Sequence, residues 1–185
     1  MAETYKVGVL VGSLRAGSLN RKLASAIANL APHTLDFTFV EVGDLPLFNE
    51  DLESNPPQEW INFRDSIKAV DAVMFVSPEY NRTVPGAVKN AIDVGSRPYG
   101  QSVWSGKPAA VVTGSPSGIG GFGANHNIRQ ALVFLDMPVM QQPEAYVSNI
   151  GGMFDEDGIV KDAGTQKFLA SIGSRFAEWI ATILS

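Results

Sequence analysis

Residues 6–20 read KVGVLVGSLRAGSLN, which is the pattern of a strand, a loop and the first turn of a helix. Lys6 to Val11 is rich in β-branched residues and almost continuously apolar, as expected of a strand covered on both faces in a parallel sheet. A loop follows from Gly12 to Ser18. From Leu19 onward, apolar residues recur at helical spacing, and Pro32 lies just beyond the expected end of that helix.

Strands and helices continue to alternate along the rest of the chain. Further strands are expected over residues 37–42, 72–76 and 109–113, with a broken fifth strand over 138–140 and 146–147. Further helices are expected after the proline pair 56–57, from 85 to 96, from a Gly-rich loop to about 135, and from about 164 to 184. Because parallel neighbours need crossover connections, this alternation predicts an α/β fold, a doubly wound five-stranded parallel sheet in three α/β/α layers. Ligands bind such sheets at the carboxyl ends of the strands.

Length and composition limit the class of protein. The chain has 185 residues, so we expect a single domain over residues 1–185, and its 45% hydrophobic and 18% charged content argues against disorder. The formal net charge of −5 has the wrong sign for a protein that neutralises many phosphates, so no nucleic-acid partner is expected. The absence of cysteine excludes disulfides, thiol nucleophiles and Cys-ligated metals.

The sequence also bears on location. The stretch after Lys6 contains only a short apolar run before Gly12, too short for a signal peptide, and no apolar run approaches 18 residues. We therefore expect a cytoplasmic protein without a membrane partner.

The first loop has the chemistry of an anion site. It leaves a buried strand and enters a helix, so free backbone N–H groups and the positive end of the helix dipole meet there. Ser13, Ser18 and Asn20 add neutral donors, and Arg15 adds a planar fork that matches phosphate oxygens. The loop alone fits equally well an N-capped helix with a solvated arginine.

Two common nucleotide-binding loops are excluded by spacing. The pattern G-x-x-x-x-G-K-[ST] fails because Ser18 stands where lysine is required, and G-x-G-x-x-G fails because Leu14 occupies the second glycine position. Glu41, near the end of the second expected strand, resembles a ribose-binding acid. Without the glycines we interpret it as an ordinary strand-end carboxylate.

The loop after the third expected strand is held rigid by two prolines. It reads Ser77-Pro78-Glu79-Tyr80-Asn81-Arg82-Thr83-Val84-Pro85-Gly86. Proline restricts its own backbone and that of the preceding residue, so the amides between Pro78 and Pro85 can be fixed against a planar heterocycle. Without a further signal, an ordinary turn before a helix explains the same residues.

Taken together, these two loops resemble one known family. The chain combines Gly12-Ser13-Leu14-Arg15, Ser18 and Asn20 with Pro78-Glu79-Tyr80-Asn81, Pro85-Gly86 and Lys89-Asn90-Ala91-Ile92-Asp93. This combination resembles the NADPH-dependent FMN reductase family over nearly the whole chain. Among its members the chain looks most like bacterial flavin-containing quinone reductases, some of which are described as chromate reductases. The resemblance implies a flavodoxin-like fold.

The resemblance also implies roles for individual residues. Ser13, Arg15, Ser18 and Asn20 would hold the FMN phosphate, and Pro78, Glu79, Tyr80 and Asn81 would line the isoalloxazine ring. The third loop, with Ser115 and Gly118, would close over the other edge of the ring. Val94 departs from the pattern, because many relatives carry a tryptophan after the Asn-Ala-Ile-Asp run.

The activity implied in this way needs no catalytic side chain. Bound FMN would accept a hydride from NADPH or NADH and pass electrons to small-molecule acceptors, namely quinones and oxyanions such as chromate, by ping-pong turnover. Relatives form dimers or tetramers. The helix over 85–96 carries apolar residues on more than one face, and the segment around Ala131 to Met140 is apolar, so we expect a homodimer or homotetramer.

The sequence also bears on three other functions. A hydrolase is disfavoured because Pro116 stands where the G-x-S-x-G elbow requires serine. A flavodoxin-like electron carrier remains the main alternative, although carriers commonly have a more acidic surface than a net charge of −5 provides. A nucleotide-sensing regulator on the same fold also stays open.

Overall fold

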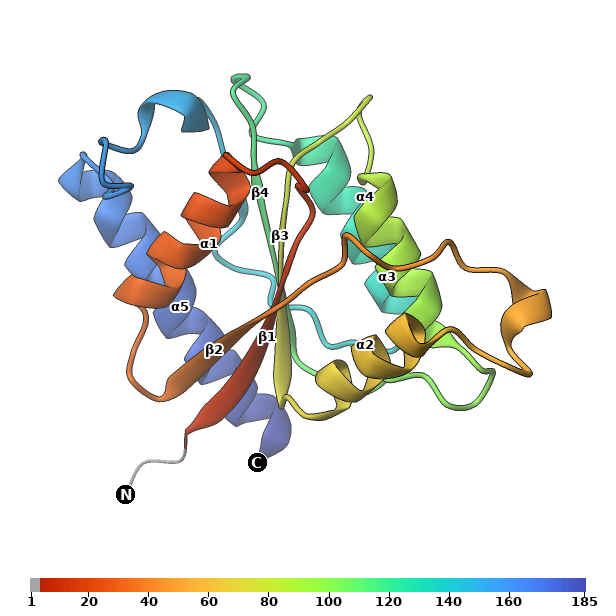
Figure 1. Ribbon diagram of the computed structural model, residues 1–185. Helices are drawn as coiled ribbons and strands as arrows, with labels where there is room; N and C mark the ends of the chain where they lie inside the picture. Colours follow the sequence, from red (N-terminus) through yellow and green to blue (C-terminus); the bar gives the residue numbers. More distant parts are fainter. Residues whose placement is uncertain (1–3) are drawn as a thin grey trace.

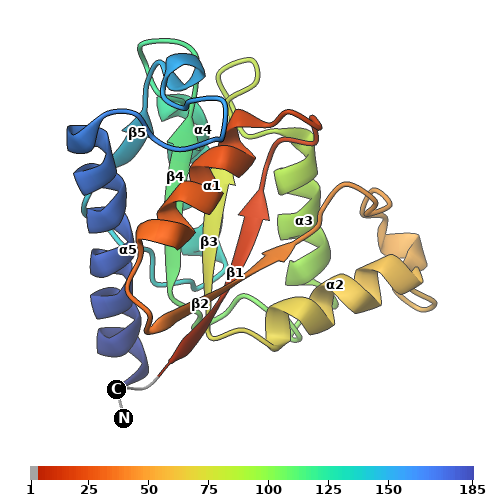
Figure 2. The same cartoon turned by 60° about the vertical axis from the view of Figure 1, so that its left-hand side comes forward.

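Five parallel strands lie side by side in the order β2-β1-β3-β4-β5; Figure 1 labels the first four of these strands and Figure 2 also labels β5. The computed structural model describes residues 4–185. The strands are β1 (Tyr5–Val11), β2 (Leu35–Val40), β3 (Ala72–Ser77), β4 (Ala109–Gly114) and β5 (Ala145–Val147). This is the flavodoxin-like order, and it confirms the predicted fold class. The order reverses direction between β1 and β3, which makes their carboxyl ends the expected ligand crevice.

Helices cover both faces of the sheet (Figures 1 and 2). The helices α1 (Leu19–Leu30) and α5 (Ala163–Leu184) pack on one face. The other face is covered by α2 (Gln58–Lys68), α3 (Gly86–Ser96) and α4 (Phe122–Phe134), and two short 3-10 turns, Glu50–Leu52 and Ile150–Gly152, lie in the connections. The two apolar cores are therefore separated by the sheet, and the three predicted layers are confirmed.

The central strands are apolar on both sides because both of their faces are covered. Every residue of β3 and β4 is buried, whereas the edge strand β2 alternates between buried and accessible positions. On α5 the buried stripe runs through Leu169, Ile172, Phe176 and Ile180, which pack in the core with α1 and the sheet. Continuous apolar runs thus mark interior strands, as expected for a parallel sheet.

The predicted bounds of the second strand are wrong by two residues, and the predicted break in the fifth strand is confirmed. The second strand was predicted over 37–42 but spans Leu35–Val40, because it pairs in parallel with β1 from Tyr5–Leu35 to Leu10–Val40 and then leaves the sheet. Val42 is buried in the same core as Val40, so the alternating apolar pattern continues two residues beyond the end of the strand. The broken fifth strand is confirmed: Val139 bridges to Ala109, and β5 resumes pairing with β4 six residues later.

The expectation that α3 buries a second face against another subunit loses its basis. Val88, Ala91, Ile92 and Val94 are all buried within this chain, between the sheet, α2 and the indole of Trp104. The Trp104 ring donates to the Ile92 carbonyl at 3.0 Å, and a Cβ at Gly95 would lie only 2.5 Å from that ring. The broad apolar surface of α3 therefore has an explanation inside the fold.

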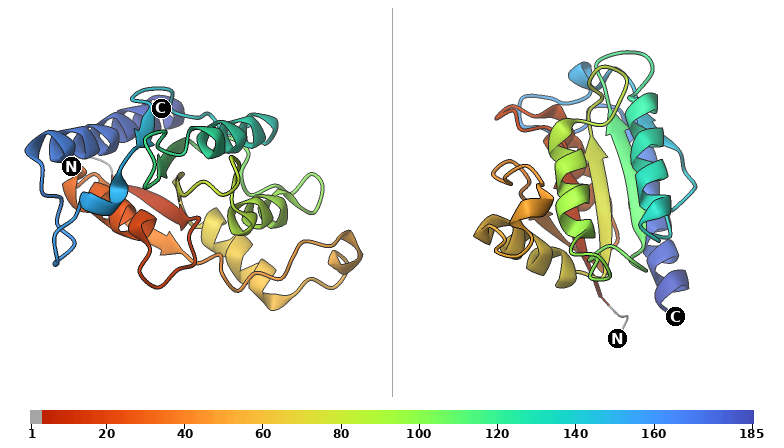
Figure 3. Two further views of the ribbon diagram at one scale, coloured as in Figure 1. Left: turned by 90° about the horizontal axis from the view of Figure 1, so that it is seen from above. Right: turned by 90° about the vertical axis from the view of Figure 1, so that its right-hand side faces the viewer.

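The loops after β1, β3 and β4 gather at one edge of the sheet, which Figure 3 shows from above in its left panel. Parallel strands bring all their carboxyl ends to the same edge, so residues as far apart in sequence as Asn20 and Gly114 become neighbours there. Within residues 4–185, the structure contains no helix that is both long and apolar enough to cross a bilayer.

Candidate functional site

The first loop begins at Gly12, between the ends of β1 and β3. The Gly12 amide donates to the Val76 carbonyl at 2.9 Å. A Cβ at Gly12 would lie 2.5 Å from Ser77 Oγ and 2.7 Å from Val88 Cγ2, closer than side-chain atoms approach. Glycine is therefore required by the close packing of β1 against β3 and α3, and the loop opens at the switch point of the sheet.

Ser18 caps the helix that follows this loop. Its Oγ accepts a hydrogen bond from the Arg21 amide at 3.1 Å, and its backbone is extended, as an N-cap requires. The first turn of α1 contains no acidic residue. The amides at the start of a helix have no partner within the helix, so this end of α1 favours an anion.

Asn20 connects the first loop to the end of β4. It is only 4% exposed, and its Nδ2 donates to the Gly114 carbonyl at 3.0 Å. Its Oδ1 is buried and has no hydrogen-bond partner among residues 4–185. A Cβ at Gly114 would lie 2.8 Å from that oxygen. Asn20 thus holds two of the three loops together and keeps an unsatisfied polar atom beside them.

Arg15 is the cationic side chain of the first loop. It is exposed, and within the described chain it has neither an ion-pair nor a hydrogen-bond partner. With Ser13 it lines a groove of about 540 Å³. By contrast, the Arg21 guanidinium lies 2.6 Å from Glu41. An unpaired guanidinium beside free amides and a serine is suited to a phosphate group.

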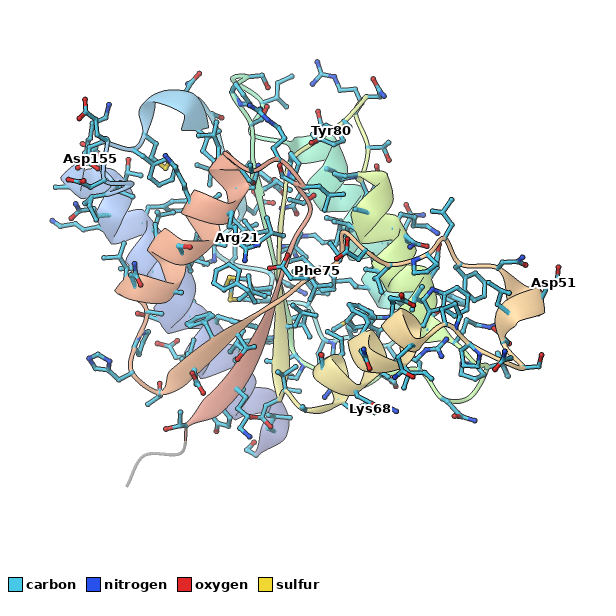
Figure 4. The ribbon with its side chains drawn as sticks, in the orientation of Figure 1. Arg21, Asp51, Lys68, Phe75, Tyr80 and Asp155 are labelled. Atoms are coloured by element: carbon cyan, nitrogen blue, oxygen red, sulfur yellow. The ribbon has the colours of Figure 1, made fainter. Side chains whose placement is uncertain are left out.

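The second loop turns at Asn81 and Arg82, which both have positive φ (50° and 65°). Tyr80 and Thr83 exchange backbone hydrogen bonds of 3.1 and 3.0 Å across this two-residue turn. Two consecutive left-handed residues are typical of a type I′ turn, and for arginine this conformation is strained. Tyr80 remains 47% exposed at the sheet edge and is labelled in Figure 4.

Glu79 joins the second loop to the third. Its side chain is 8% exposed, and Oε2 accepts a hydrogen bond from the Ala124 amide at 3.1 Å, while Oε1 lies 3.3 Å from Arg82 Nη1. Helix α4 begins after Gly121 and has no side-chain cap of its own. The Glu79 carboxylate therefore supplies the missing cap from another loop.

The third loop is fixed by close backbone contacts. Gly120 and Gly121 have positive φ, and a Cβ at Gly120 would lie 2.5 Å from the Tyr146 carbonyl carbon. Ser115 donates its amide to the Val147 carbonyl, and the Gly118 carbonyl accepts from Ser148 Oγ at 2.9 Å. Both predicted residues of this loop thus belong to a segment bonded to β5.

An aromatic cluster flanks the third loop. Phe122 packs against the rings of His126 and Tyr146, with centroid separations of 4.2 and 5.2 Å. The Tyr146 hydroxyl lies 3.1 Å from His126 Nε2 and 3.1 Å from Glu144 Oε1. Burial, together with the nearby Glu144 carboxylate, raises the pKa of Tyr146. The cluster keeps the start of α4 packed on β5.

The ten predicted site residues all lie on the three loops at the carboxyl edge or in the first turn of α1. Sequence reasoning missed the partners that join these loops, namely Ala124, Asn127, whose Oδ1 accepts from Thr83 Oγ1 at 2.6 Å, and Gly114. One signal was available: the pair Gly120-Gly121 precedes a helix that lacks an N-cap side chain, so a cap from elsewhere is needed.

The comparison with protein families decides the family. The model of the NADPH-dependent FMN reductase family matches residues 5–152, which contain all ten predicted site residues. This chain belongs to that family. The resemblance of the two loops is therefore confirmed, and the family's description names both a pyridine nucleotide donor and FMN.

Individual relatives agree with this assignment. A quinone reductase of Pseudomonas putida is 59% identical over 181 residues, with 97% of each chain covered. A 2-hydroxy-1,4-benzoquinone reductase of a Burkholderia species is 41% identical, covering 95% of this chain and 96% of its own. Among solved structures, FerB of Paracoccus denitrificans, a flavoenzyme NAD(P)H:(acceptor) oxidoreductase, superposes with a TM-score of 0.92 at 42% identity, covering 97% of this chain and 98% of its own.

Proposed function

We propose that this reductase holds FMN across the three loops and uses NADH or NADPH to reduce quinones. One observation carries the proposal: three loops meet at the carboxyl edge of the sheet. The first is an anion-binding loop with an unpaired arginine, and Glu79 joins the second loop to the helix that follows the third. The quinone reductase of Pseudomonas putida, identical at more than half of the aligned positions, supports the class of acceptor.

The first loop fits the FMN phosphate. Ser13, Arg15 and the amides at the start of α1 supply donors of the required charge, and Ser18 fixes the helix end that presents them. Asn20 retains a second amide hydrogen beyond the one bonded to Gly114. The required Gly12 leaves no side chain between the loop and β3.

The second and third loops fit the ring. Tyr80 and Asn81 belong to a turn whose backbone is fixed by two hydrogen bonds, and Pro78 lies two residues before it. Ser115 and Gly118 belong to a loop bonded to β5 and the residue after it. Glu79 acts on the ring through the geometry of both loops, because its carboxylate caps α4. Loops that are already held by hydrogen bonds lose little conformational entropy when a planar ring binds between them.

When bound, FMN supplies the hydride chemistry. The chain itself needs to orient the flavin, leave one ring face open and offer amide donors to the ring edge. Tyr80 stays half exposed beside this site. A single open site would admit donor and acceptor in turn, which would give ping-pong turnover. Such a face accepts quinones readily and takes an oxyanion such as chromate as a poorer acceptor.

We further propose a homodimer or homotetramer in the cytoplasm. The segment from Ala131 to Met140 remains the interface, because Val133 and Phe134 on α4 are 74% and 89% exposed. Exposed apolar side chains side by side on one helix are typical of subunit contacts. Light scattering that gives only the monomer mass of 19.8 kDa at micromolar concentration would contradict this assembly.

Purified protein tests the proposal by its flavin content and its kinetics. Flavin bands near about 370 and 450 nm are expected. Steady-state oxidation of NADH or NADPH with a quinone should give parallel double-reciprocal lines, and excess quinone should inhibit competitively against the donor. Flavin binding without oxidation of either nucleotide would instead identify the electron carrier.

A further inference from the structure

A groove of about 540 Å³ lies beside the first loop, on the side of the edge strand β2. Its walls include Ser13 and Arg15 from the loop, Arg21 from α1, and Phe39, Glu41 and Asp44 from the end of β2 and the segment after it. The loops proposed to contact the flavin ring, after β3 and β4, do not line it. The groove therefore shares only the phosphate-binding loop with the proposed FMN site.

Arg21 forms a flat, fixed surface in this groove. Its guanidinium lies 5.0 Å from the centroid of the Phe39 ring, and its Nη2 lies 2.6 Å from Glu41 Oε1. The hydrogen bond to Glu41 raises the pKa of Arg21, which keeps the guanidinium charged. Figure 4 labels Arg21 where α1 passes over the sheet. The ring beneath and the carboxylate at the edge fix the plane of the guanidinium, and its side chain stays half exposed.

We propose that this groove binds the adenylate half of the pyridine nucleotide donor. Adenine stacks on the Arg21 guanidinium, Glu41 accepts hydrogen bonds from the ribose hydroxyls, and Arg15 contacts the phosphate. This inference rests on the proposed function, because it supplies a place for the part of the donor that does not react.

The chemistry of each group selects this ligand. Arginine planes stack on nucleobases, and a guanidinium already resting on an aromatic ring is pre-organised for a second planar partner. An acidic residue after the second strand is the group that binds ribose hydroxyls in other nucleotide-binding sheets. From the sequence alone Glu41 is interpreted as an ordinary strand-end carboxylate, and its place in this groove beside Arg21 revises that interpretation. Glu41 follows β2 directly, and its Oε2 has no partner within residues 4–185.

The same carboxylate predicts which donor is preferred. A 2′-phosphate on the ribose would place a dianion against Glu41, and Asp44 lines the same groove. Like charges this close disfavour binding, so the groove favours NADH over NADPH. Arg21 does not reverse this preference, because its Nη2 is already bonded to Glu41.

The test uses FMN-loaded protein, so that the phosphate loop is filled, and 5′-AMP as the probe in isothermal titration. Arg21→Gln should weaken 5′-AMP binding about tenfold or more, the scale of a lost cation–π contact together with its released ion pair. Lys22→Gln is the matched control, because Lys22 is the next residue of α1 and lines a different groove, with Glu156 and Asp157. Lys22→Gln should leave the 5′-AMP affinity unchanged.

A second variant tests the role of Glu41. Glu41→Gln should weaken 5′-AMP, strengthen 2′,5′-ADP, and lower the ratio of kcat/KM for NADH over NADPH about tenfold, as expected for a lost charge interaction. NAD⁺ should displace 5′-AMP from the wild-type protein. If 5′-AMP binds without competition from NAD⁺, the groove serves a free adenine nucleotide and the inference is wrong.

Other outcomes separate this inference from the proposed function. If FMN-loaded protein oxidises NADH but does not bind 5′-AMP, or binds it equally well in all variants, the groove is not the adenylate site and the quinone reductase proposal stands. If 5′-AMP binds only when FMN is absent, it occupies the phosphate loop and the inference is overturned. If no flavin is retained, the proposed function falls. The groove is then tested separately: loss of 5′-AMP affinity in Arg21→Gln and Glu41→Gln but not in Lys22→Gln supports it, and equal affinity in all three variants overturns it.

Discussion

The Glu79 carboxylate lies 3.1 Å from the backbone nitrogen of Ala124, 45 residues further along the chain. This contact joins the loop after β3 to the helix after β4, at the edge where the ring of the cofactor is proposed to bind. A Cβ at Gly123 would lie 2.4 Å from the Arg82 carbonyl oxygen and 2.9 Å from Glu79 Oε2. The loop after β3 and the first turn of α4 are thus in close contact, and a side chain at position 123 would not fit between them.

Removing the Glu79 carboxylate should loosen both loops. Glu79→Ala leaves the start of α4 without a cap and should lower the free energy of unfolding by about 1 kcal/mol, while weakening FMN binding. Glu79→Gln keeps an acceptor for the Ala124 amide and should retain most of the flavin affinity. Urea unfolding and flavin titration measure the two effects. Equal flavin affinity in Glu79→Ala and wild type would show that the ring does not depend on this contact.

Arg15→Ala should weaken FMN binding by roughly 1 to 3 kcal/mol, the range of a charge-assisted hydrogen bond, and leave the fold intact. The reason is that Arg15 is exposed and unpaired in the described chain. Arg175→Ala is the control, since Arg175 is also exposed but pairs with Glu178 on α5. Titration of the apo-protein with FMN decides the matter, and an unchanged dissociation constant for Arg15→Ala would remove Arg15 from the site.

The stability of the protein should depend on which of two glycines of the first loop is replaced by alanine. Gly12→Ala forces a Cβ against Ser77 and Val88 and should destabilise the protein by about 1 to 3 kcal/mol, as overpacking does. A Cβ at Gly17 meets no atom within 4 Å, so Gly17→Ala should be nearly neutral. Thermal unfolding of both variants compares them directly. Equal melting temperatures would mean that β1 and β3 are not packed as described.

Asp162 makes the stability of α5 depend on pH. Its Oδ2 accepts hydrogen bonds from the Thr165 amide and hydroxyl at 2.6 and 2.9 Å, and the amide bond above all lowers the pKa of the Asp162 carboxyl. A carboxyl with a lowered pKa in the folded state stabilises above its unfolded value and loses that contribution as the pH falls. Asp162→Asn should therefore reduce stability near neutral pH and flatten its decline below about pH 4. Urea unfolding at several pH values measures the difference; parallel profiles for the two proteins would refute this role.

Local pattern predicted the elements of this fold well because interior parallel strands are apolar on both faces. The runs ending at Val11, Val76 and Thr113 could be placed within a residue or two. The second strand could not, because Val42 is buried in the same core as Val40 although the strand has already ended at Val40. The apolar breadth of α3 was equally ambiguous, since the Trp104 that covers it comes from a separate segment.

For the candidate site, the place of the ten residues in the fold could be predicted, and the contacts that connect their loops could not. Motif residues such as Arg15 and Tyr80 stand out because loops after buried strands must meet at one edge. That the buried carboxylate of Glu79 serves α4 depends on a contact across two loops, which no local pattern encodes. The partner of the Glu79 carboxylate is a backbone amide, and the amino-acid sequence does not show which backbone amides lack a partner in their own helix or strand.

The most direct measurement of the central claim is an anaerobic mixing experiment in two steps. FMN-loaded protein mixed with one equivalent of NADH should lose its absorbance near about 450 nm, and addition of a quinone after removal of NAD⁺ should restore it, because donor and acceptor use the site in turn. Complete bleaching followed by stoichiometric recovery is the predicted result. A flavin band that persists with NADH alone, or that bleaches only when the quinone is already present, would contradict sequential use of one face of the ring.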